Sequence, residues 1–192
     1  EGVSGVSVPK AYPQLSSSKV LTMEFMAGVK INNVEAIDAA GLDRLEIGQN
    51  ILRALIKQLL IDGFFHADPH PGNVLVNLET GAVGFLDMGM MGEIDLNQRL
   101  NLINLLMVSR QKDAAGLARA VRSLSVPFRK SVNDGAFYKD FERAIGRYMD
   151  PDSPASFGPL MGIVFDLLAT HGLRLDSDLT LAIKAMMQAE AI

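Results

Sequence analysis

The sequence contains no cysteine, and this absence excludes disulfide bonds and thiolate metal sites. Basic residues are not in excess either. The net charge is −4, so the composition does not indicate a nucleic-acid-binding protein. No stretch approaches the roughly 20 uninterrupted apolar residues that a membrane-spanning helix needs. The first residues have neither a basic start nor an apolar core, and they do not read as a signal peptide.

The apolar content is nevertheless high enough for a packed core. Hydrophobic residues make up 48% of the 192 residues and charged residues 21%, as in one domain or a large piece of a larger protein. A β-type composition predicts a strand over 19–25, and leucines at three- and four-residue spacings predict a helix over 42–62 that stops at Gly63. Two short apolar runs, 74–77 and 83–87, flank a glycine-containing turn and predict a hairpin.

Helical patterns dominate the second half of the chain. We expect helices over 95–111, 113–124, 134–149, 157–171 and 176–190, with a break at the proline-containing segment 150–156. The order is therefore strand, long helix, loop, small hairpin, loop and many helices. This order predicts an α+β fold.

The polar chemistry concentrates at the two ends of the predicted hairpin. His66, Asp68, His70 and Asn73 precede its first strand within the string HADPHPGN, which holds two of only three histidines in the chain. Asp87 ends the second strand. Because a hairpin brings its two ends together, we expect these groups to face one another across a shared cleft.

Oxygen ligands in this cleft favour magnesium over zinc. Asp68, Asn73 and Asp87 offer two carboxylates and an amide oxygen, and Mg²⁺ binds through one or two carboxylates plus phosphate oxygens and water. His66 and His70 have the spacing of a helical zinc site, but Pro69 and Pro71 argue against a helix. The set resembles a phosphoryl-transfer site, in which one carboxylate orients a hydroxyl while an asparagine and another aspartate hold the metal.

The same strings resemble a known family. HADPHPGN resembles the catalytic loop of protein kinases, LDMG at 86–89 resembles their metal-binding loop, and LTMEFMAG at 21–28 resembles the strand and hinge that carry adenine. FHADPHPGN followed by LDMGMMGEID is similar to the UbiB/AarF family of atypical kinase-like proteins, which is linked to ubiquinone and other prenyl-lipid biosynthesis. Aminoglycoside-type phosphotransferases share the shorter pattern but not the second His-Pro. The resemblance implies a protein-kinase-like fold, mainly the helical C-lobe.

The resemblance also implies a role for each matching residue. Asp68 matches the catalytic aspartate, while Asn73 and Asp87 match the metal ligands. His66 matches the first residue of the catalytic loop, which usually anchors the loop by hydrogen bonds. His70 lies where many kinases have a lysine near the transferred phosphate, and both a phosphate contact and a loop-fixing role remain open for it.

The implied cofactors are ATP and Mg²⁺. Glu24 and Met26 match the hinge, where backbone groups meet adenine. Ala67 replaces an arginine that in many kinases contacts a phosphorylated activation loop, so we do not expect that mode of activation.

We expect residues 1–28 to be the end of an N-lobe with the hinge, and residues 29–192 to be a kinase-like C-lobe, as a fragment of a larger protein. The family's K-x-G-Q extension, alanine-rich nucleotide loop and strand lysine are not found in the sequence, so the upstream N-lobe is expected to lie outside it.

The leading prediction is an ATP-dependent atypical kinase or ATPase that supports ubiquinone biosynthesis, with little activity from this fragment alone. The alternative is a catalytically weak kinase-like regulatory or scaffolding module for lipid-pathway enzymes. The resemblance suggests nucleotide, prenyl-lipid pathway enzymes or membrane lipid as partners, and the cytoplasmic face of a bacterial membrane, or its organelle equivalent, as the location.

Overall fold

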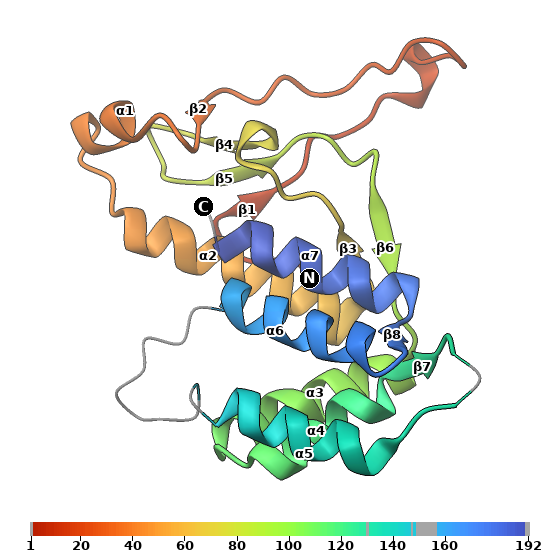
Figure 1. Ribbon diagram of the computed structural model, residues 1–192. Helices are drawn as coiled ribbons and strands as arrows, with labels where there is room; N and C mark the ends of the chain where they lie inside the picture. Colours follow the sequence, from red (N-terminus) through yellow and green to blue (C-terminus); the bar gives the residue numbers. More distant parts are fainter. Residues whose placement is uncertain (1, 130, 147, 149–156, 191–192) are drawn as a thin grey trace.

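The computed structural model describes residues 2–129, 131–146, 148 and 157–190 (Figure 1). The first half holds β1 (Val6–Ser7), the 3-10 turn η1 (Pro13–Leu15), β2 (Val29–Lys30), α1 (Val34–Ala39), α2 (Arg44–Lys57), the π-helical turn η2 (Gln58–Asp62), β3 (Phe64–His66), the 3-10 turn η3 (Pro71–Asn73), β4 (Val74–Val76), β5 (Val83–Phe85) and β6 (Met91–Glu93). The second half holds α3 (Leu96–Arg110), α4 (Ala114–Ser123), β7 (Ser125–Pro127), α5 (Asp134–Ile145), α6 (Phe157–Thr170), β8 (Leu173–Leu175) and α7 (Ser177–Glu190).

The largest sheet is built around the β4–β5 hairpin. Its strand order is β1-β5-β4-β2, with β1 parallel to β5 and β2 antiparallel to β4. Val74 pairs with Phe85 and Val76 with Val83 across the hairpin. Two smaller sheets, β3–β6 and β7–β8, each hold one antiparallel pair. The predicted hairpin and the α+β class are both confirmed.

The buried apolar side chains form two separate cores. The hairpin core joins α1, α2 and the hairpin, and its buried members include Ile37, Ile51, Leu55, Val74, Val76, Val83 and Phe85. The helical core joins β3 to the helices from α3 onward, and its buried members include Phe65, Ala67, Leu117, Phe137, Phe141, Leu168 and Leu179. Each large side chain fully removed from water contributes about 1.5–3 kcal/mol to folding.

Helix α2 begins and ends where the sequence predicts. The Asp43 carboxylate accepts hydrogen bonds from the backbone N–H groups of Leu45 (2.8 Å) and Glu46 (3.4 Å), as an N-cap does. Gly63 ends the π-helical turn with φ of +72°, and a Cβ there would lie 2.8 Å from the Ile94 carbonyl oxygen. Only glycine accepts both conditions without strain, so the chain turns here into β3.

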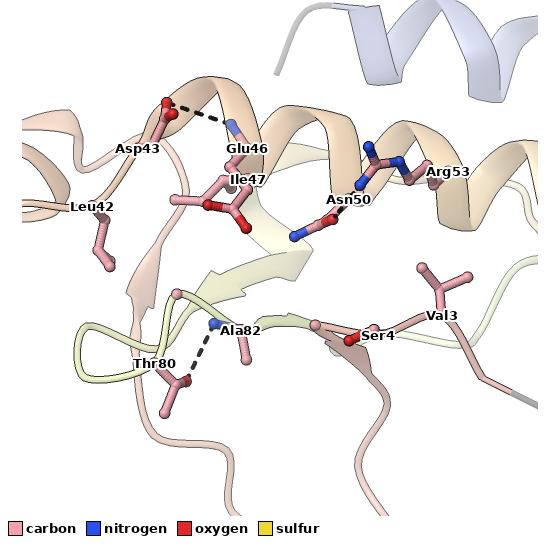
Figure 2. Close-up of a pocket in the computed structure, with 12 residues that line it drawn as sticks. Val3, Ser4, Leu42, Asp43, Glu46, Ile47, Asn50, Arg53, Thr80 and Ala82 are labelled. Carbon is pink, nitrogen blue, oxygen red and sulfur yellow. Dashed lines mark hydrogen bonds between the residues drawn. The ribbon is translucent and has the colours of Figure 1, made fainter.

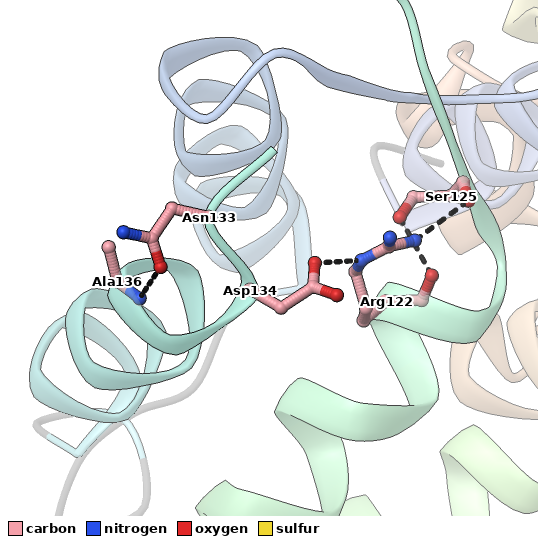
Figure 3. A network of polar contacts seen from close by, with 5 residues as sticks. All are labelled: Arg122, Ser125, Asn133, Asp134 and Ala136. Atoms are coloured by element: carbon pink, nitrogen blue, oxygen red, sulfur yellow. Dashed lines mark hydrogen bonds and ion pairs between the residues drawn. The ribbon is translucent and has the colours of Figure 1, made fainter. Parts of the chain in front are cut away.

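A polar network fixes the turn between α4 and α5 (Figure 3). The Arg122 Nε donates to the Asp134 carboxylate at 2.6 Å, and the Ser125 hydroxyl donates to the Arg122 carbonyl at 2.8 Å. Asn133 caps α5 by accepting from the Ala136 N–H at 3.0 Å. These bonds join the end of α4 to the start of α5, while β7 pairs with β8 through its backbone.

The predicted strand over 19–25 is wrong. This segment folds back on the preceding residues through two isolated bridges, Ala11 with Met23 and Ser17 with Val20. A strand needs a continuous ladder, and here Phe25 is 90% exposed and Leu21 70% exposed, so β-type composition alone does not produce one.

The other helices of the second half match the predicted ranges within a few residues, although α5 ends earlier, at Ile145. The sequence patterns did not indicate α1 or the short strands β3, β6, β7 and β8. The predicted break at 150–156 lies outside the described residues. A helix able to cross a bilayer is not found among the residues that the structure describes.

Candidate active site

The predicted catalytic segment connects the two cores. Phe65 and Ala67, at its start, belong to the helical core and are fully buried, whereas Val74, at its end, belongs to the hairpin core. The Ala67 N–H also donates to the Met90 carbonyl at 3.0 Å, next to the β3–β6 pairing. The polar residues in between therefore sit on a backbone that is fixed at both ends.

His66 is a buried anchor of this segment. Its backbone N–H donates to the Gln58 side chain at 2.9 Å, its Nδ1 accepts from the Asp68 N–H at 3.2 Å, and its ring meets Phe85 edge-on at 5.7 Å. Burial lowers the pKa of His66, and the nearby carboxylates of Asp68 and Asp87 only partly oppose this effect. The imidazole is therefore neutral near pH 7, which agrees with a structural role.

Asp68 is half-buried, and its carboxylate has a distant partner. The side-chain amide of Gln188, in the last turn of α7, donates to Asp68 Oδ1 at 2.7 Å. The Asp68 carbonyl accepts from the His70 N–H at 2.7 Å. The sequence patterns did not reveal Gln188, because the two residues are 120 positions apart and no local spacing relates them.

His70 is exposed and shapes the loop. Its Nδ1 accepts from the Gly72 N–H at 3.0 Å, and its carbonyl accepts from the Asn73 N–H at 2.8 Å. These two bonds begin and close the turn η3. The loop-fixing role is thus visible in the structure, while a phosphate contact by His70 stays a prediction.

Asn73 and Asp87 lie at the same end of the paired strands β4 and β5, Asn73 directly before β4 and Asp87 two residues after β5. The Leu86 N–H donates to the Asn73 carbonyl at 2.8 Å, so Asp87 is one position beyond the residue that faces Asn73. The exposed Asp87 carboxylate accepts from the Gly89 N–H at 2.9 Å through Oδ1. The structure thus brings these two residues to one end of the hairpin. His66 lies there too, because the charges of both Asp68 and Asp87 act on its pKa.

This pair of oxygen donors fits a partial magnesium site. A carboxylate and an amide oxygen are the hard ligands that Mg²⁺ takes from proteins, with water and phosphate oxygens completing the shell. Within the described residues, no group of three or more histidine, aspartate and glutamate side chains is placed to hold a metal alone. The assignment of Asn73 and Asp87 as metal ligands stays a prediction.

The predicted hinge residues line a small pocket beside the hairpin. Glu24 and Met26 line a pocket of about 180 Å³ together with Leu75 and Gly84. The Met26 side chain lies against Gly84, where an added Cβ would be 2.5 Å from Met26 Cε. Leu75 was not among the residues predicted for this pocket. The alternation in β4 was the available signal, since Val74 and Val76 face the hairpin core and the residue between them points away.

A larger pocket lies elsewhere (Figure 2). It has a volume of about 530 Å³ and is formed by the hairpin turn, residues 42–53 and residues 3–5. Asp43, Glu46 and Arg53 line it, and the predicted site residues are not among its lining. This pocket and the predicted site residues therefore lie at opposite ends of the hairpin.

Comparisons with known proteins agree with the predicted family. Residues 1–121 match the model of a family described as ABC1 atypical kinase-like domain. The chain is 32% identical over 192 residues to uncharacterized protein sll1770 of Synechocystis sp., covering 100% of this chain and 33% of that protein. It is 31% identical over 196 residues to Protein ACTIVITY OF BC1 COMPLEX KINASE 7, chloroplastic, of Arabidopsis thaliana, covering 99% of this chain and 27% of that protein.

A solved structure supports the fold. The complex of Rv3197 with erythromycin from Mycobacterium tuberculosis superposes with a TM-score of 0.55 at 16% identity, covering 97% of this chain and 47% of that one. At this identity the likeness speaks for the fold alone. The chain spans only 27% to 33% of the two relatives that match it along its length. The fold is kinase-like, and the chain belongs to the ABC1 atypical kinase-like family, as its resemblance to UbiB/AarF proteins predicted.

Proposed function

We propose that the chain is the catalytic-loop and metal-loop part of an ATP-dependent atypical kinase or ATPase that supports ubiquinone, or another prenyl-quinone, biosynthesis. One observation carries the proposal. Asp68 and Asn73 precede the hairpin, on a segment fixed by two cores, and Asp87 follows its second strand, so that all three lie where the hairpin begins and ends. The quinone pathway rests on the family resemblance.

The nucleotide would lie along the hairpin from the hinge to the metal ligands. The apolar side chain of Leu75 offers a face for a flat base in the pocket that Glu24 and Met26 also line. The backbone of these hinge residues supplies hydrogen-bonding groups for adenine. The Glu24 side chain itself accepts from the Lys10 N–H at 3.2 Å, so its carboxylate is directed at its own turn. The triphosphate would then extend along β4 toward Asn73.

Each polar residue of the segment has one task in this proposal. Asn73 and Asp87 would hold Mg²⁺, which neutralises charge on the transferred phosphate when it is bound. Asp68 orients the attacking hydroxyl or water and accepts its proton. His66 stays neutral and fixes the loop through Gln58, while His70 shapes the turn. Transfer to a small molecule, transfer to a protein and hydrolysis all use the same arrangement.

The test is Mg²⁺-dependent ATP consumption by the full natural chain. Asp68→Asn and Asp87→Asn should each lower the rate roughly 100-fold or more, as loss of a general base or a metal ligand does. Asp178→Asn is the matched control, because Asp178 is an exposed carboxylate in the first turn of α7. Rates that stay unchanged in both site variants would refute catalysis at this site.

A second function is a nucleotide-binding regulatory or scaffolding module. In that case Mg-ATP would raise the melting temperature of the protein, as any ligand of the folded form does, while turnover stays absent in the wild type. The feature that favours a contact function is an exposed apolar face on α2 and α3.

This apolar face joins two stripes of side chains at helical spacing. On α3 the stripe comprises Leu96, Leu100, Ile103 and Met107, and on α2 it comprises Leu45, Leu52 and Ile56. Ile56 and Leu106 meet across a small apolar pocket between the two helices. Exposed apolar side chains that gather on a surface commonly mark a contact with a partner or a membrane.

Charge on the same helices favours a membrane as the partner of this face. Together α2 and α3 carry five basic residues and one acidic residue, and two of the basic residues, Arg44 and Lys57, pair with Asp38 and Asp62. Basic residues beside an apolar face suit anionic lipid. We therefore propose that the protein works at the cytoplasmic face of a bacterial membrane, or at its organelle equivalent.

Vesicle flotation tests this contact. The full natural chain should bind phosphatidylglycerol vesicles more strongly than phosphatidylcholine vesicles, and the exposed pair Leu100→Ser with Met107→Ser should weaken that binding. Equal binding by the variant and the wild type would exclude this face as the lipid contact. Loss of binding to a prenyl-lipid pathway enzyme, with lipid binding intact, would instead assign the face to a protein partner.

A further inference from the structure

We infer that Gln188, in the last turn of α7, is a positioning residue for the Asp68 carboxylate. The inference rests on the proposed function of Asp68. The Gln188 Nε2 donates to Asp68 Oδ1 at 2.7 Å, and both side chains are half-buried. Gln188 lies outside residues 1–121, which match the family model. The contact thus ties the catalytic segment to an element beyond that match.

The end of α7 is held in place, so the amide has a fixed position. Ala182 and Ala185 are buried in the helical core, on the same helix. Ala189 packs against the hairpin core, and the Glu190 carboxylate accepts from the Gly158 N–H of α6 at 2.8 Å. Helix α7 also contacts both α2 and β6. A side chain placed by a rigid, packed helix can orient a partner more accurately than one on a loop.

The chemistry of the contact suits a carboxylate oxygen as the acceptor. An amide N–H that donates to one carboxylate oxygen fixes the rotamer of Asp68. The other oxygen, Oδ2, then remains available to a hydroxyl group. The reverse orientation of the amide would place two acceptors against each other, so the hydrogen-bonding pattern itself defines which end of Gln188 faces Asp68.

A second observation points the same way. The Gln188 Oε1 is buried and has no hydrogen-bond partner within the described part of the chain. Buried acceptors are almost always paired in folded proteins, so an unpaired one calls for an explanation. This unpaired oxygen lies directly beside the proposed catalytic carboxylate.

A similar hydrogen bond elsewhere in the fold serves as a control, because its loss should affect stability but not the position of Asp68. The Gln98 Nε2 donates to the Asp176 carboxylate, also at 2.7 Å and also partly buried. It joins the start of α3 to Asp176, just before α7, at the opposite end of that helix from Gln188. Replacing Gln98 removes the same side-chain amide group, but at a position that has no part in the proposed reaction.

The experiment measures Mg²⁺-dependent ATP consumption by the full natural chain. Gln188→Ala should lower kcat roughly 10- to 100-fold, with the KM for ATP little changed, because a displaced catalytic group slows the chemical step more than binding. Gln188→Glu keeps the shape but sets a second carboxylate against Asp68, so its kcat should fall at least as far. Gln98→Ala should lower the melting temperature and leave kcat nearly unchanged.

Combined variants decide between the possible outcomes. In an Asp68→Asn background, Gln188→Ala should have little further effect on kcat, because both residues act as one unit. If Asp68→Asn abolishes turnover while both Gln188 variants keep the wild-type kcat, the inference alone is overturned. If the wild-type rate does not depend on Asp68, the proposed function is lost and the inference falls with it.

Discussion

Replacing Gly28 with alanine should detach the hinge from the hairpin. Gly28 connects the hinge to β2 with φ of +155°, and an added Cβ would lie 2.6 Å from the Val76 carbonyl oxygen. A residue with a side chain in such a conformation costs about 1–3 kcal/mol. A clash with backbone cannot be relieved by rotating a side chain, so β2 must move away from β4. Losing two backbone hydrogen bonds of about 1 kcal/mol each brings the total to about 3–5 kcal/mol.

Hydrogen exchange gives the local measurement. The Ile31 N–H donates to the Val74 carbonyl at 3.0 Å, so its exchange should accelerate in Gly28→Ala, and the affinity for Mg-ATP should fall as Glu24 and Met26 shift. Gly41→Ala is the matched control, with φ of +72° and no atom within 4 Å of the added Cβ, and should cost only about 1–2 kcal/mol. If both variants exchange at the same rate and bind nucleotide equally, the reasoning about the hinge is refuted.

Three further predictions concern stability. Burial lowers the pKa of His66 below 6.5, so at low pH the unfolded chain takes up a proton that the folded chain does not. The free energy of unfolding should therefore fall as the pH drops below about 6.5. Urea unfolding at several pH values should show that His66→Gln reduces this dependence. Phe137→Ala, at a fully buried position beside Phe141, should lower the free energy of unfolding by about 3–5 kcal/mol, and a loss under 1 kcal/mol would contradict the packing. Asn133→Ala should cost about 1 kcal/mol by removing the cap of α5, whereas Asn133→Asp should retain most of it.

The helices of the second half were predictable because local signals agree. Asp95, Asp113 and Asn133 each accept a backbone N–H at the start of a helix, and the apolar residues that follow recur at helical spacing. The hairpin was predictable for the same reason, because its two short apolar runs and the glycine-containing turn between them both indicate a hairpin. Its geometry alone then brought Asn73 and Asp87 to the same end.

Features that depend on distant partners were not predictable. The segment 19–25 has the composition of a strand, but a strand forms only where a neighbour offers a continuous ladder of hydrogen bonds. The short helix α1 is six residues long and begins at Asn33 within a polar stretch, where the apolar pattern is weak. Gln188 meets Asp68 only through the packing of α7, which no local pattern encodes.

The most direct test of the central claim is a crystal structure of the full natural chain with Mn²⁺ and a non-hydrolysable ATP analogue. Anomalous scattering locates the Mn²⁺ independently of the protein density. The account predicts one metal ion bound by the Asp87 carboxylate and the Asn73 amide oxygen, with the base against Leu75. A metal ion bound away from both residues, or a nucleotide in the larger pocket beside Asp43 and Arg53, would contradict it.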